Sequence, residues 1–113
     1  MSETRTFAEP SFSVTVFVAG DIQAARASLR RQCFEDGLCV TVTPTTFVYT
    51  AGAEEGVAVG LVNYPRFPKT PADIKARALK VAEQLMDDLC QWSALVVTPE
   101  ETVWLTRRPE GAK

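Results

Sequence analysis

The segment that decides the fold is Gly37–Pro71, GLCVTVTPTTFVYTAGAEEGVAVGLVNYPRFPKTP. Apolar and polar residues alternate in its first part, which is typical of a strand with one buried face. Pro44 cannot donate to a neighbouring strand, so it predicts a break, and residues 51–56 predict a Gly-bearing hairpin loop. The segment therefore predicts strands over residues 38–43, 47–50 and 57–64, followed by a proline-rich loop that leads into a helix.

The flanking sequence predicts two helices and further strands. Residues 11–18 alternate as a strand, Asp21 suits a helix N-cap, and Gly37 suits the left-handed end of that helix. A second helix is predicted to start at Thr70, with Pro71 at its first position, and to reach about Gln91. Its apolar residues Ile74, Ala78, Val81, Leu85 and Leu89 repeat at helical spacing. Residues 93–98 and 102–107 predict a closing hairpin.

This order predicts an α+β fold with a ferredoxin-like split βαβ arrangement and extra strands. Both helices are expected on one face of a mainly antiparallel sheet, because each strand has only one strongly apolar side. The other face would carry Phe17, Cys39, Thr41 and Trp104 and would suit self-association. We expect residues 1–10 to be a flexible lead, residues 11–108 a single domain and residues 109–113 a short tail.

Composition excludes several classes of function. The chain has 113 residues and a formal net charge of −2, so a general binder of nucleic acid or anionic membranes is not expected. No stretch has the length of a membrane span and the polar start does not fit a signal peptide, which favours a cytoplasmic protein. Three cysteines without paired spacing indicate free thiols.

The chain contains no histidine, which narrows the chemistry that it can perform. Ser-His-Asp and Cys-His mechanisms cannot be built within it, and no zinc site is expected. The sequence gives no catalytic constellation, no metal site and no cofactor motif. Adjacent carboxylates such as Glu54 and Glu55 are interpreted as solvated surface or turn residues.

The candidate binding residues lie in the proline-rich loop. Tyr64, Arg66, Phe67 and Lys69 combine two aromatic rings with two positive charges. Prolines between them stiffen the backbone and lower the entropy lost on binding. The alternative interpretation is that Tyr64 and Phe67 only cover the end of the sheet.

Two resemblances concern most of the chain. The run GLCVTVTPTTFVYT at residues 37–50, continued by VNYPRFP at residues 62–68, resembles small uncharacterised bacterial and prophage-encoded proteins, which implies no known activity. The architecture is also similar to trimeric ferredoxin-like proteins of the CutA type. The chain lacks the histidine-bearing C-terminal segment expected there, so the resemblance implies no metal role.

Three functions remain open at this point. The favoured one is a non-enzymatic protein-binding or interaction module, such as a phage or prophage accessory protein, that uses the open sheet face and the loop of residues 64–69. The second is an oligomeric small-molecule-binding regulatory protein with a site between subunits. The third is a small His-free ferredoxin-like enzyme that uses a carboxylate, tyrosine or arginine. In each case we expect a homodimer or higher homo-oligomer.

Overall fold

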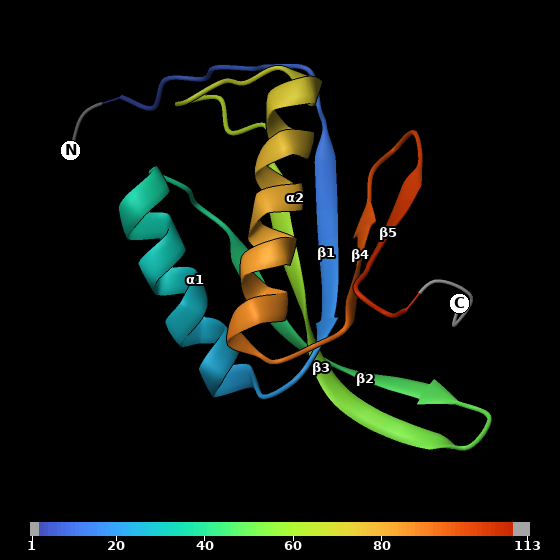
Figure 1. Cartoon of the computed structure of the whole chain (residues 1–113). Helices are drawn as coiled ribbons and strands as arrows, with labels where there is room; N and C mark the ends of the chain where they lie inside the picture. The colour runs from blue at the N-terminus through green and yellow to red at the C-terminus, as the bar shows by residue number, and fades with distance from the viewer. Residues whose placement is uncertain (1–2, 110–113) are drawn as a thin grey trace.

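The computed structural model describes residues 3–109 and confirms the α+β fold. Within these residues the chain forms, in order, β1 (Ser13–Ala19), α1 (Ile22–Asp36), β2 (Thr41–Tyr49), β3 (Gly52–Val62), α2 (Pro71–Asp88), β4 (Ser93–Val97) and β5 (Thr102–Thr106) (Figure 1). The strand order is β2-β3-β1-β4-β5, and every neighbouring pair is antiparallel. Strands β2, β3, β1 and β4 form the split βαβ arrangement, and β5 is an added edge strand.

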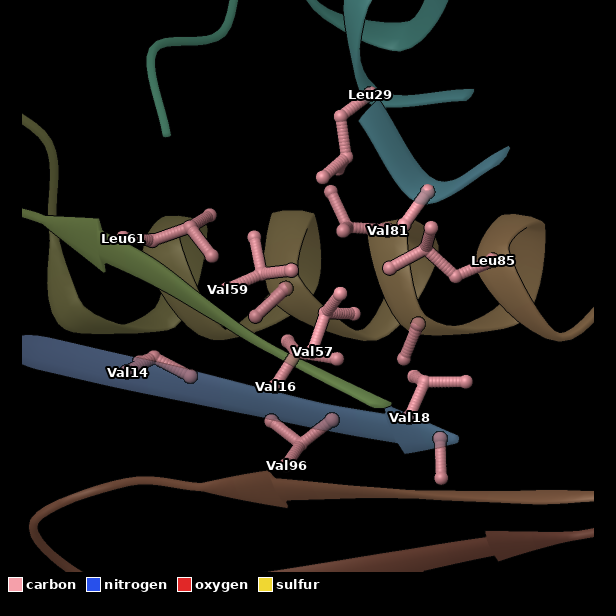
Figure 2. Packing of buried hydrophobic residues seen from close by; sticks show 14 of the residues in the cluster. Val14, Val16, Val18, Leu29, Val57, Val59, Leu61, Val81, Leu85 and Val96 are labelled. Carbon is pink, nitrogen blue, oxygen red and sulfur yellow. The ribbon is translucent and has the colours of Figure 1, made fainter. Parts of the chain in front are cut away.

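The core lies between one face of the sheet and the two helices. Val14, Val16 and Val18 of β1 are buried on that face, and Val16 pairs with Val59 of β3. Figure 2 shows the valines of the strands gathered beside α2, with Leu29 approaching from α1. Both helices therefore cover the same face, as the alternation in the strands predicts.

The helix ends follow the local sequence. Asp21 accepts a hydrogen bond from the Ala24 backbone N–H at 2.9 Å and caps α1. Gly37 ends α1 with a φ of 65°, a conformation that glycine adopts without strain. Thr70 caps α2 by accepting from the Asp73 N–H at 3.1 Å. All three agree with the sequence, although α2 ends at Asp88 and not at Gln91.

Two predictions about the first hairpin are wrong. Pro44 does not break a strand: β2 runs unbroken through it, and Pro44 pairs with Val57. This is possible because β2 is an edge strand, where the missing N–H can face solvent. Residues 52–56 are not a loop but the start of β3, so the connection is only Thr50-Ala51.

The corrected hairpin is long, and its end extends past the part of the sheet that the helices cover (Figure 1). Val48 near its tip is 80% exposed, and Tyr49 is exposed as well. Phe47 and Glu54 pair across the hairpin two residues before this tip. In residues 3–109 we find no helix long and apolar enough to cross a membrane.

Candidate functional site

The face of the sheet opposite the helices carries an aromatic row. Phe17 of β1 pairs with Leu95 of β4, which pairs in turn with Trp104 of β5. Residues directly paired across neighbouring strands point to the same side of a sheet, so these three side chains lie on the same face. The prediction that Phe17, Thr41 and Trp104 share the uncovered face agrees with this register. Cys39 lies before β2 begins and is outside the sheet.

Phe47 extends this row toward the β2–β3 hairpin. Its ring meets the Phe17 ring edge to face, with centroids 6.4 Å apart. Gly56 makes room for it: a Cβ at this position would lie 2.3 Å from Phe47 Cε2. The buried glycine therefore lets the ring lie flat against β3, which a larger residue would prevent.

These rings line a depression of about 310 Å³ that we call the aromatic hollow. Its lining consists of Phe17, Ala19, Phe47, Glu54, Gln91, Trp92, Ser93, Ala94, Leu95, Trp104 and Arg108. Such a volume lies at the lower end of the range for small-molecule sites, about 300–1,000 Å³. The hollow is therefore the candidate ligand site on this face.

One carboxylate and one guanidinium stand in the hollow. Glu54 pairs with Phe47 in the β2–β3 register, so its side chain lies beside that ring. Glu55 points to the opposite face, where the Thr46 hydroxyl donates to its carboxylate at 3.2 Å. Arg108 follows β5 at the other side of the hollow. The site can thus bind a flat aromatic group and a cation on its rings, with opposite charges on either side.

Sequence reasoning missed Glu54, because residues 51–56 were predicted to be a loop with solvated carboxylates. In a strand, the two adjacent carboxylates face opposite sides, and only one of them enters the hollow. Pairing Phe47 with Glu54 across a two-residue turn would have placed Glu54 in a strand. That pairing requires Pro44 to be interpreted as a residue of an edge strand.

The predicted binding residues lie at the other end of the sheet from the hollow. Their loop follows Val62, which pairs with Ser13 at the start of β1, whereas Ala19 at the end of β1 lines the hollow. The structure brings the loop residues together: the Tyr64 and Phe67 rings are 6.1 Å apart, and the Arg66 guanidinium lies 5.3 Å from the Phe67 ring centre.

Asn63 holds this loop in place. Its side-chain Oδ1 accepts from the Lys69 backbone N–H, and its Nδ2 donates to the Pro10 carbonyl, both at 2.9 Å. Tyr64 and Phe67 remain largely exposed. The loop is thus a braced surface feature, and its binding role stays a prediction.

A second polar cluster joins the two helices and is structural. Asp88 of α2 accepts from the buried Ser28 hydroxyl at 2.6 Å and from Gln84 at 3.1 Å, and it pairs with Arg31. The Ser28 hydrogen bond, followed by those of Gln84 and Arg31, lowers the pKa of the Asp88 carboxyl.

Elsewhere, burial raises the pKa of the Cys33 thiol. No grouping of three metal-ligating side chains occurs in residues 3–109.

Comparisons with known proteins give a match in structure alone. No protein-family model matches the chain, and no curated protein matches its sequence. Two solved structures match over 99% of this chain and 100% of theirs. They are a phage SAM lyase in the apo state, with a TM-score of 0.71 and 16% identity, and a phage SAM lyase in complex with S-methyl-5′-thioadenosine, with a TM-score of 0.73 and 15% identity.

These matches correct the favoured function. The expectation of a non-enzymatic interaction module, and of an enzyme as the less favoured alternative, is overturned because two solved structures that share this fold from end to end are named as lyases. The missing histidine excluded only the mechanisms that need one. The expected likeness to small phage proteins holds at the level of the fold, but those proteins have a named activity.

Proposed function

We propose that this chain is a lyase that cleaves S-adenosylmethionine (SAM) and releases S-methyl-5′-thioadenosine. The observation that carries the proposal is the full-length fold match to phage SAM lyases, one of them holding S-methyl-5′-thioadenosine. At this level of identity the match supports the fold, so the assignment of activity rests also on the chemistry of the aromatic hollow.

The hollow suits the substrate group by group. An adenine ring can stack on Trp104 or Trp92, a contact of about 1–3 kcal/mol per base. The sulfonium cation is attracted to aromatic faces, here Phe17 and Phe47, and to the Glu54 carboxylate. Glu54 and Arg108 are opposite in charge, as are the ammonium and carboxylate groups of the methionine part of SAM.

The chemistry requires no histidine. S-methyl-5′-thioadenosine keeps the sulfur with its methyl and adenosyl groups, so the bond that breaks joins sulfur to Cγ of the methionine part. A lyase adds no water, so the four-carbon fragment leaves either as a lactone, after its own carboxylate attacks Cγ, or as an alkene, after loss of a Cβ proton. In both routes the bonding electrons go to sulfur and the sulfonium becomes a neutral thioether.

We favour the internal attack of the substrate carboxylate. It needs no protein base, since the carboxylate is already ionised at neutral pH, whereas a Cβ proton would need a strong base. Within residues 3–109, Glu54 is the one acidic residue that lines the hollow, and no lysine of this range lines it. Glu54 would hold the cation and place the reacting atoms in line. With SAM deuterated at Cβ, this route keeps both deuterium atoms in the released fragment, and elimination loses one.

The chain offers a matched pair of variants for testing the site. Glu54→Gln removes the carboxylate in the hollow, and Glu55→Gln removes its neighbour on the opposite face of β3. We expect Glu54→Gln to lower kcat/KM by roughly 100-fold, the lower end of the effect of removing one preorganised electrostatic group from a reacting centre. Glu55→Gln should stay within about threefold of wild type. Equal losses in both variants would contradict the placement of the site.

We also propose that the protein works as a homo-oligomer. Trp92, Leu95 and Trp104 leave a sizeable apolar surface on the uncovered face, with Trp92 54% exposed. Such surfaces usually mark interfaces, and a second copy over this face would shield the hollow from water. Light scattering should give a mass of at least two chains, and a strict monomer at high concentration would contradict the proposal.

A further inference from the structure

A second depression, larger than the aromatic hollow, lies away from it between α1 and the edge strand β2. We call it the α1–β2 groove. It has a volume of about 630 Å³, roughly twice that of the hollow, and is lined by Gln23, Arg26, Ala27, Leu29, Arg30, Cys33, Val40 and Val42. Both helices lie on one side of the sheet (Figure 1). The groove is lined by residues of α1 and is therefore on that side, whereas the hollow is lined by Phe17 and Trp104 of the uncovered face.

The floor of the groove is apolar. Leu29 is almost fully buried, and Val40 and Val42 are half-buried and packed against the core. The half-buried valines keep part of their apolar surface in contact with water. An apolar group placed there would remove that surface from water, which is favourable by about 25 cal/mol per Å².

The rim of the groove is positively charged. Arg26 and Arg30 are one helical turn apart on α1, and both line the groove. The ion pairs between residues 3–109 use Arg31, Lys75, Lys80 and Arg107 as their cations, and none uses Arg26 or Arg30. Among the residues that the structure describes, no acidic one lines the groove. Two like charges at this spacing repel each other, so an anion bound between them would relieve the repulsion.

We propose that the α1–β2 groove binds a small amphipathic anion, with its carboxylate between Arg26 and Arg30 and its apolar body on Leu29, Val40 and Val42. The volume fits a small molecule, whereas a protein partner would need a wider surface of about 800 Å² on each side. SAM does not fit this description, since its sulfonium would face two guanidinium groups. The groove is therefore a site separate from that of the proposed lyase activity.

Decanoate is a suitable probe, because it joins one carboxylate to an unbranched apolar chain. Titration calorimetry below its micelle-forming concentration should show saturable binding at one site per chain. Decyltrimethylammonium has the same chain with a positive head, and butanoate has the same head with a short chain. We expect both to bind at least about tenfold more weakly, since each lacks one of the two interactions. Equal binding of the anion and the cation, or no saturable binding of decanoate, would overturn the proposal.

Single charge removals then locate the site. Arg26→Gln and Arg30→Gln should each weaken decanoate binding about tenfold, the effect of losing one charge-assisted hydrogen bond. Arg5→Gln removes the same charge from the N-terminal segment, outside the groove, and should leave binding unchanged. Circular dichroism confirms that each variant is folded. Undiminished binding in the double variant Arg26→Gln/Arg30→Gln would also overturn the proposal.

Discussion

Gly56→Ala tests how the fold forms the aromatic hollow. A Cβ at this position would lie 2.3 Å from Phe47 Cε2, 2.6 Å from the Val18 carbonyl oxygen and 3.0 Å from Ala19 Cα. The Phe47 ring could rotate away, but the two backbone atoms of β1 could not, because Ala19 pairs directly with Gly56. The substitution must therefore push β1 and β3 apart as well as displace the ring.

Overpacking of this kind costs about 1–3 kcal/mol. Guanidinium denaturation should show that loss as a lower midpoint with an unchanged slope, and the melting temperature should fall by roughly 3–8 °C for each kcal/mol. SAM cleavage should fall further than stability alone explains, because Phe47 leaves its place beside Phe17.

Gly52→Ala is the matched control, since it lies in the same strand. Its nearest new contact would be Tyr49 Cε2 at 3.9 Å, an ordinary van der Waals distance. We expect a change in the free energy of unfolding within about 0.5 kcal/mol. If Gly56→Ala proves as stable and as active as Gly52→Ala, the close approach of Phe47 and β1 to Gly56 is wrong.

Three further predictions concern the core, the acid range and the loop. Leu85→Ala should lose about 2–5 kcal/mol of stability in denaturant unfolding, because Leu85 of α2 is fully buried in the hydrophobic core. A loss below about 1 kcal/mol would contradict this. Asp88 has a lowered pKa in the folded chain, so its stabilising effect is present above its ordinary pKa of about 3.9 and is lost as the pH falls through the lower folded value. Between about pH 5 and about pH 2, wild type should therefore lose more stability than Asp88→Asn. Parallel curves of stability against pH for the two proteins would refute the stabilising role of the Asp88 carboxylate. Arg66→Ala/Phe67→Ala should lower the melting temperature by only a few degrees, as expected for exposed residues; wholesale unfolding would show that the loop is part of the core.

The sequence was enough for the layers of the fold, because local patterns determine them. The alternation of Val14, Val16 and Val18 identified the buried face of β1, and the caps at Asp21 and Gly37 bounded α1. These features depend on neighbours in the chain, so they can be inferred without knowing which strands pair.

The site could not be inferred in the same way, because it depends on pairing between distant strands. Phe17, Phe47 and Trp104 meet only in the order β2-β3-β1-β4-β5, and no local pattern gives that order. Pro44 hid the length of β2, since it is acceptable only on an edge strand. That error also left Glu54 in a predicted loop, whereas the prolines and aromatic residues around Tyr64, at the other end of the sheet, gave a strong local signal.

The most direct test of the proposed activity is a time course of S-methyl-5′-thioadenosine formation from SAM, followed by reversed-phase chromatography. The purified 113-residue chain should form this product in proportion to its own concentration and well above a protein-free blank, which corrects for spontaneous breakdown of SAM. Glu55→Gln should match wild type, and Glu54→Gln should fall toward the blank. Folded wild-type protein that forms no more product than the blank would contradict the proposal that this chain is a SAM lyase.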